Sequence, residues 1–104
     1  MRKVAYPIPG EILMEEFLEP MGIAQYHLAK EIGVSQRRIG EIVVWAGGIT
    51  ADTGLRLSRI FGMSEGFWVS LQMDHDAALA KDTLGKILSN ITPWKHKGND
   101  VADA

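Results

Sequence analysis

The 104-residue sequence contains no cysteine and no long hydrophobic run, and its formal net charge is only −2. Without cysteine the chain can form neither a disulfide bond nor a thiolate metal site. No apolar stretch approaches the roughly 20 residues that a membrane-spanning helix needs, and the first residues lack the apolar core of a signal peptide. We therefore expect a cytoplasmic protein that makes no contact with a membrane.

Motifs of common catalytic sites are also missing. The sequence has no glycine-rich phosphate loop, no HExxH motif and no cysteine nucleophile. The only cluster with metal-ligand atom types is Asp74, His75 and Asp76. Adjacent residues on a helix point about 100° apart, so these three side chains cannot close around one ion. We expect no enzymatic activity, no metal and no cofactor.

The charged residues are unevenly distributed along the chain. Nucleic-acid-binding domains are often basic overall, which this chain is not. Four arginines nevertheless lie between residues 35 and 60, and four glutamates without any basic residue lie between residues 11 and 19. This segregation indicates one face for an anionic partner and one for a cationic partner. An ordinary solvated helix face is the alternative interpretation of the glutamates.

Residues 25–43 have the pattern of two short helices joined by a tight turn. Apolar residues recur at helical spacing in both halves: Leu28, Ala29 and Ile32, then Ile39, Ile42 and Val43. Gly33 suits the left-handed backbone that ends a helix, and Ser35 can cap the helix that follows. Two helices connected in this way form a helix-turn-helix.

Three polar residues stand at the start of the second of these helices: Gln36, Arg37 and Arg38. In DNA-binding helix-turn-helix proteins, this part of the second helix enters the major groove. Arginine can donate two hydrogen bonds to guanine, and glutamine can pair in a similar manner with adenine. The pattern therefore favours DNA binding. A solvated helix face without DNA is the alternative, because the motif also occurs as plain packing.

One further helix is indicated before this motif and another after it. The first begins at Pro9, where the missing amide proton costs nothing, and is expected to end at Pro20 and Gly22. The fourth is expected to be capped by Thr50 and to end at Gly62.

A fifth helix is predicted after Ser64, and the Ser64 side chain is expected to cap this helix. A break or kink is expected in the helix near residues 74–76. Residues 1–8 are expected to be extended. Residues 93–104 are polar and lack periodicity, so we expect a disordered tail after a helix-turn-helix domain that spans residues 1–92. Five helices with short connections and no convincing strand predict an all-α domain.

Four segments together resemble the HigA antitoxins, which are phage-repressor-like helix-turn-helix proteins. The segments are Pro9-Gly10-Glu11, the helix-turn-helix with its Leu28-Ala29 and Gly33-Val34-Ser35, ITADTGLRL at residues 49–57, and FWVSLQ at residues 67–72. The similarity runs from about residue 7 to about residue 79. The helix-turn-helix is widespread, whereas the last two segments are much more specific.

The resemblance implies a five-helix lambda-repressor-like domain that forms a homodimer and binds a palindromic operator. It also implies a partner, a small basic HigB-like toxin that is an mRNA-cleaving ribonuclease. The antitoxin binds and neutralises this toxin and represses their shared operon. A stand-alone helix-turn-helix repressor without a toxin is the alternative, because it shares the fold. An interaction module that has lost DNA binding is a third interpretation, favoured by the acidic net charge.

Carried over by position, the resemblance implies DNA contacts at six residues: Gln25, Ser35, Gln36, Arg37, Arg38 and Thr50. Gln25 and Thr50 stand at helix starts, which readily bind phosphate. Ser35 is expected both to cap its helix and to contact DNA. Trp68 and Leu71 are expected in the core or in the dimer interface, because aromatic residues at helical spacing usually pack.

The sequence departs from the family pattern just after the second helix of the motif. The family usually has a glycine and one or two basic residues before Ile-Thr, whereas this chain has Val44, Trp45, Ala46 and Gly47. The missing basic loop predicts weaker DNA binding with a flatter salt dependence. Trp45 is expected either to lie against the core or to reach a partner. Gly54 stands where alanine is usual, at a cost of about 1 kcal/mol in a helix.

Overall fold

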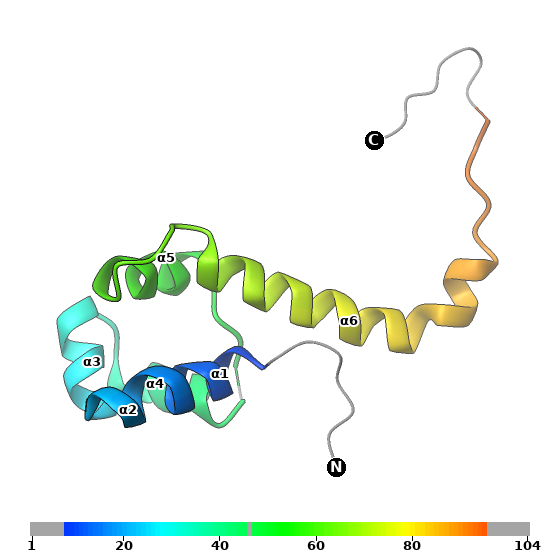
Figure 1. The fold of residues 1–104 in the computed structure, drawn as a ribbon. Coiled ribbons are helices and arrows are strands. Elements are labelled where there is room, and N and C mark those ends of the chain that lie inside the picture. The colour runs from blue at the N-terminus through cyan, green and yellow to red at the C-terminus, as the bar shows by residue number, and fades with distance from the viewer. Residues whose placement is uncertain (1–7, 46, 96–104) are drawn as a thin grey trace.

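The computed structural model describes residues 8–45 and 47–95, and every regular element in these ranges is helical (Figure 1). The elements are α1 (Pro9–Ile12), the π-helical η1 (Leu13–Leu18), α2 (Glu19–Met21), α3 (Gln25–Ile32), α4 (Gln36–Val43), α5 (Ala51–Ile60) and α6 (Phe67–Ser89). Because α1, η1 and α2 follow one another without a gap, they correspond to one predicted helix. The prediction of an all-α domain with five helices is confirmed. The extended start and most of the predicted tail, at residues 1–7 and 96–104, lie outside the described residues.

The first helix passes through Pro20, and the prediction that Pro20 ends it is wrong. A proline inside a helix normally clashes with the carbonyl group four residues earlier. Here the preceding segment is π-helical, and the Glu19 amide donates to the Met14 carbonyl five residues back. The wider turn makes room for the proline ring. The helix ends instead at Gly22, whose φ of 65° is the left-handed conformation predicted there.

Two of the three predicted helix caps are confirmed. The Ser35 hydroxyl accepts a hydrogen bond of 3.0 Å from the Arg38 amide at the start of α4. The Thr50 hydroxyl accepts one of 3.2 Å from the Thr53 amide at the start of α5. Each cap satisfies an amide that the helix itself leaves without a partner, so both helices begin at a defined residue.

The predictions for the last helix need two corrections. Ser64 does not cap it with its hydroxyl, because its backbone carbonyl accepts from the Phe67 amide at 3.2 Å and Gly66 occupies the capping position. The break expected near residues 74–76 is absent, and α6 is one continuous helix. No proline interrupts its amides, and Gln72 Nε2 donates to Asp76 Oδ1 at 2.9 Å across successive turns. Figure 1 shows α6 running out beyond the other helices.

Trp68 lies at the centre of the core and is fully buried. Its ring lies 5.3 Å from the ring of Phe17 in η1 and 6.4 Å from that of Phe61 after α5. Aromatic pairs at such distances pack favourably and bury large apolar areas. Leu71 is partly buried against the same cluster. The expectation of a packing role for both residues in α6 is confirmed, and the core is where the first and last helices meet.

Gly54 lies where α5 and α6 approach each other closely. A Cβ atom added to Gly54 would lie 2.9 Å from Cγ2 of Val69 and 3.4 Å from Cγ2 of Ile49. Val69 is β-branched and cannot easily rotate away from such a contact. The glycine therefore accommodates Val69, which explains why alanine is disfavoured at this position of α5.

We expect Gly54→Ala to lower the free energy of unfolding by about 1 kcal/mol, because overpacking outweighs the gain in helix propensity. In a Val69→Ala background, Gly54→Ala is expected to raise the free energy of unfolding, since the space beside Gly54 is then open. Urea denaturation of the wild type, the two single variants and the double variant measures both effects. An equal effect of Gly54→Ala in both backgrounds would contradict the packing explanation.

Candidate nucleic-acid interface

The helix-turn-helix of α3 and α4 is held by its own backbone. Gly33 ends α3 with a φ of 75°, and the Val34 amide donates to the Ala29 carbonyl at 3.0 Å. This arrangement is the Schellman motif, which closes the end of a helix. Val34 packs against the core, and Ser35 then caps α4. The turn that the sequence predicts is therefore present, with the inward faces of both helices buried.

Three polar side chains occupy the first turn of α4. Gln36 is exposed, and the Arg37 side chain is 86% exposed. Arg37 Nε lies 3.2 Å from Glu41 Oε2, an ion pair one helical turn apart. An exposed pair of this kind contributes only about 0.3–0.5 kcal/mol, so a stronger acceptor can displace Glu41. Arg38 is half-buried and helps to line a pocket between α4, the following loop and α6.

The remaining predicted site residues stand at the beginnings of helices close to α4. Gln25 is the first residue of α3, and its Oε1 lies 3.8 Å from the position that a Cβ of Gly40 would take. Thr50 caps α5 and lines the same pocket as Arg38. Ser35 is exposed at the start of α4. The structure thus gathers all six residues around α4 and the starts of α3 and α5, while their contacts with DNA stay predictions.

The loop after α4 has an unusual conformation at Trp45. Its φ of 64° is the only positive value at a non-glycine residue in the described part of the chain. Trp45 is 53% exposed, and its Cδ1 lies 3.2 Å from where a Cβ of Gly10 would stand. A Cβ there would also overlap the carbonyl oxygen of Ile42. Gly10 therefore allows α1 to approach α4, and one edge of Trp45 lies against the start of α1.

Gln72 is a structural contributor to the site that the sequence did not indicate. Its Oε1 accepts a hydrogen bond of 2.8 Å from the Ile49 amide, one residue before the cap of α5. Gln72 thereby ties the end of the loop to α6 and fixes the position of Thr50. The only trace of Gln72 in the sequence is that a polar residue ends the otherwise largely apolar FWVSLQ segment. Hydrophobic periodicity does not indicate which backbone group such a residue contacts.

The described residues contain neither a metal-binding group nor a membrane-spanning helix. Among them, no three histidine or carboxylate side chains are grouped so that they could hold a metal ion. None of the described helices is both long enough and apolar enough to cross a membrane.

Comparisons with known proteins agree on one group of relatives. No protein-family model matches the chain. The chain is 51% identical over 73 residues to virulence-associated protein I of Dichelobacter nodosus, a match that covers 70% of this chain and 68% of that protein.

Among solved structures, the chain is similar to the antitoxin HigA of Pseudomonas aeruginosa with the higBA promoter. The sequences are 38% identical, the TM-score is 0.79, and the match covers 86% of this chain and 98% of the other. It is also similar to the antitoxin GraA in complex with its operator. Here the identity is 34%, the TM-score is 0.80, and the match covers 92% of this chain and 99% of the other.

Proposed function

This chain belongs to the HigA family of helix-turn-helix antitoxins, and we propose that it binds operator DNA as a homodimer and neutralises a HigB-like ribonuclease toxin. Members of this family are DNA-binding regulators, so the chain is not an enzyme. The observation that carries the proposal is the start of α4, where Ser35 caps the helix and three polar side chains follow on its surface. Related antitoxins have been solved with operator or promoter DNA, which supports the same use of this surface.

The proposed DNA contacts fall into two kinds. Gln36, Arg37 and Arg38 read base edges in the major groove, because glutamine and arginine provide paired donors there. Gln25 and Thr50 hold the phosphate backbone, because helix starts present free amides and positive dipole ends. Ser35 adds a phosphate contact beside its cap. A repressor of this kind works where its operator DNA lies, which places it in the cytoplasm.

The proposed dimer uses the outer face of α6. Met73, Ile87 and Leu88 are exposed there, although all three are large apolar residues. At 100° per residue Met73 and Leu88 lie on the side of α6 opposite Trp68, which faces the core, and Ile87 lies on the flank of that side. Exposed apolar stripes of this kind mark interaction surfaces. We call this surface the α6 stripe, and it comprises Met73, Ala77, Ala80, Leu84, Ile87 and Leu88.

The proposed toxin-binding face is the acidic side of the first helix. Glu15, Glu16 and Glu19 are exposed on η1 and α2, and none of them forms an ion pair within the described residues. A small basic toxin complements this charge, and such complementarity steers association and fixes orientation. The acidic face and the start of α4 lie on different helices, so one protomer presents two separate charged surfaces.

The test looks for a small basic reading frame that adjoins this gene and co-expresses its product with this protein. Wild-type protein is expected to restore growth, and Glu15→Lys/Glu16→Lys is expected to bind the toxin about tenfold more weakly, because two attractions become repulsions. The same variant should still shift the upstream DNA fragment in a gel, which serves as the folding control. Unchanged toxin binding would contradict the acidic face. If the wild type shifts the DNA fragment but gives no protection, the alternative of a stand-alone repressor replaces the antitoxin proposal.

A further inference from the structure

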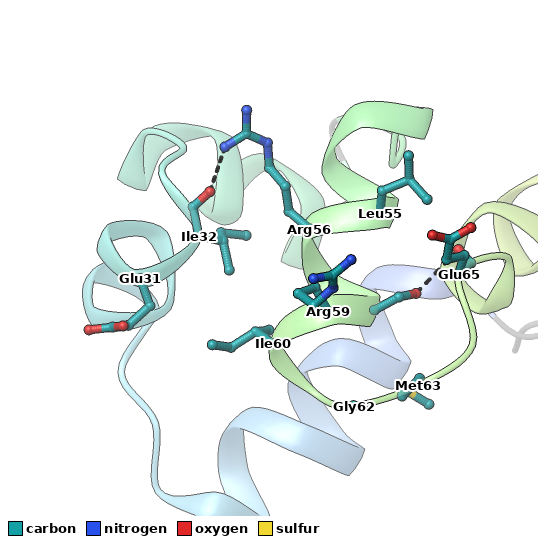
Figure 2. Close-up of a pocket in the computed structure, with 10 residues that line it drawn as sticks. Glu31, Ile32, Leu55, Arg56, Arg59, Ile60, Gly62, Met63 and Glu65 are labelled. Atoms are coloured by element: carbon teal, nitrogen blue, oxygen red, sulfur yellow. Dashed lines mark hydrogen bonds between the residues drawn. The ribbon is translucent and has the colours of Figure 1, made fainter.

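Arg56 connects α5 to the turn of the helix-turn-helix. Its Nη1 donates a hydrogen bond of 2.6 Å to the Ile32 carbonyl, the last residue of α3, as Figure 2 shows. The same nitrogen lies 3.4 Å from the Gly33 carbonyl. Nε of the guanidinium donates to Asp52 Oδ1 at 2.6 Å, one turn earlier on α5. One side chain thus spans two helices that lie 24 residues apart in the sequence.

The carbonyl groups that Arg56 meets are the ones that α3 cannot satisfy itself. The last carbonyls of a helix lack partners within it, and its C-terminal end attracts a positive charge. Gly33 leads through Val34 directly into α4, so a contact at this end of α3 fixes where α4 begins. Asp52 holds the guanidinium plane, because an arginine donates several hydrogen bonds in a rigid fork.

We propose that Arg56 is a positioning residue for operator binding. It clamps the turn between α3 and α4 against α5, so that the start of α4 and the start of α5 are held in one geometry before DNA arrives. This inference rests on the proposed DNA-binding function and adds to it a residue that acts without touching DNA. Holding a recognition surface in its bound geometry raises affinity because less ordering is left to the binding step.

A direct phosphate contact is the competing role for an arginine in this place. The structure opposes it, because two of the guanidinium nitrogens already donate to protein oxygens. The Asp52 carboxylate beside them is largely exposed and would repel a phosphate group. The two roles differ in salt dependence, since each lost phosphate contact reduces the slope of log K against log salt by about 0.9, whereas a clamp leaves it unchanged.

Arg59 provides a matched control on the same helix. It lines the same pocket of about 570 Å³ as Arg56, and Figure 2 shows both side chains there. Its side chain forms no hydrogen bond or ion pair with any residue in the described ranges. Arg59→Gln therefore removes the same charge as Arg56→Gln without removing a clamp.

The experiment measures binding of the full chain to its upstream DNA by fluorescence anisotropy across a series of salt concentrations. Arg56→Gln is expected to raise the Kd about tenfold with an unchanged salt slope, and Arg59→Gln is expected to leave the Kd within about twofold. Amide hydrogen exchange in the protein without DNA is expected to quicken at residues 33–38 only in the Arg56 variant. A salt slope that falls by about 0.9, or an unchanged Kd, overturns the proposal.

Two further variants keep the test decisive. If Arg56→Gln fails to fold, Arg56→Lys replaces it, and an intermediate loss of affinity is expected because an ammonium group lacks the rigid fork. Asp52→Asn is expected to weaken binding, as Arg56→Gln does, although it removes a negative charge. Tighter binding by Asp52→Asn would overturn the clamp.

If wild-type protein itself does not bind the fragment, the proposed DNA-binding function fails, while the exchange measurement still decides whether Arg56 holds the turn.

Discussion

Replacement of Arg37 and Arg38 together by alanine is expected to weaken operator binding about 100-fold, because each arginine that meets a guanine contributes about 1–3 kcal/mol. Both side chains stand in the first turn of α4, where the Ser35 cap fixes the beginning of the helix. A gel shift with the DNA upstream of the gene measures the loss. Arg59→Ala, which removes one charge on α5 instead of α4, is the control and should retain wild-type affinity.

The single variants separate base reading from phosphate binding. A residue that reads a base loses discrimination at one operator position, whereas a phosphate contact weakens binding to all sequences alike. Arg37 is almost fully exposed and only lightly held by Glu41, so it is free to reach a base edge. Arg38 is half-buried beside the pocket that Thr50 also lines, so a loss of discrimination at one operator position in Arg38→Ala is the result that supports base reading by this side chain. Wild-type affinity in both single variants would overturn the proposed role of α4.

Local signals in the sequence were sufficient for most of the helix boundaries. Gly33 and Gly22 adopt the left-handed conformation that their residue type favours, and Ser35 caps α4 through an amide only three residues away. Such features depend on neighbours in sequence, so the sequence displays them. Ser64 shows the limit of this reasoning, because its hydroxyl could have capped a helix but the chain turns through Gly66 instead. A cap residue indicates where a helix can begin and does not compel it to begin there.

Contacts between distant segments could not be predicted in this way. Arg56 meets Ile32 across 24 residues, and Gln72 meets Ile49 across 23 residues. Neither contact changes the hydrophobic periodicity of its helix, which is the signal that a single sequence offers. Gly54 could be recognised as a departure from the family, but its reason is Val69 on another helix. The residues that position the candidate site were therefore missed, while the DNA contacts assigned to the residues at its surface stay predictions.

The candidate site itself came from two sources in the sequence. The pattern of α3 and α4 indicated Gln36, Arg37 and Arg38, and the family resemblance added Gln25 and Thr50. The structure places these residues around the starts of three helices, and their contacts with DNA stay predictions. Trp45 had two possible roles in the sequence, and the structure shows one edge of it against α1 while half of its surface stays exposed.

Ile87→Glu is expected to convert the protein from a dimer to a monomer and to weaken operator binding about 100-fold, since two linked half-sites raise affinity by about 10²–10⁴. Ile87 is 55% exposed on the α6 stripe, and a carboxylate there would be buried without a partner in the proposed interface. Ser89→Glu introduces the same charge two residues away, on the opposite side of α6, and should leave the dimer intact. Light scattering at micromolar concentration measures the mass of each variant.

Binding to a half-site distinguishes loss of the dimer from damage to the DNA-binding surface. A wild-type dimer prefers the full palindrome to a single half-site, because the second contact is made at high effective concentration. The Ile87→Glu monomer loses this preference yet keeps the wild-type affinity for a half-site, since Ile87 lies in the exposed part of α6 and outside the buried core. Weak binding to both DNAs would mean that the α4 surface was damaged. A wild-type protein that is monomeric in solution would remove the basis for assigning the α6 stripe to a dimer.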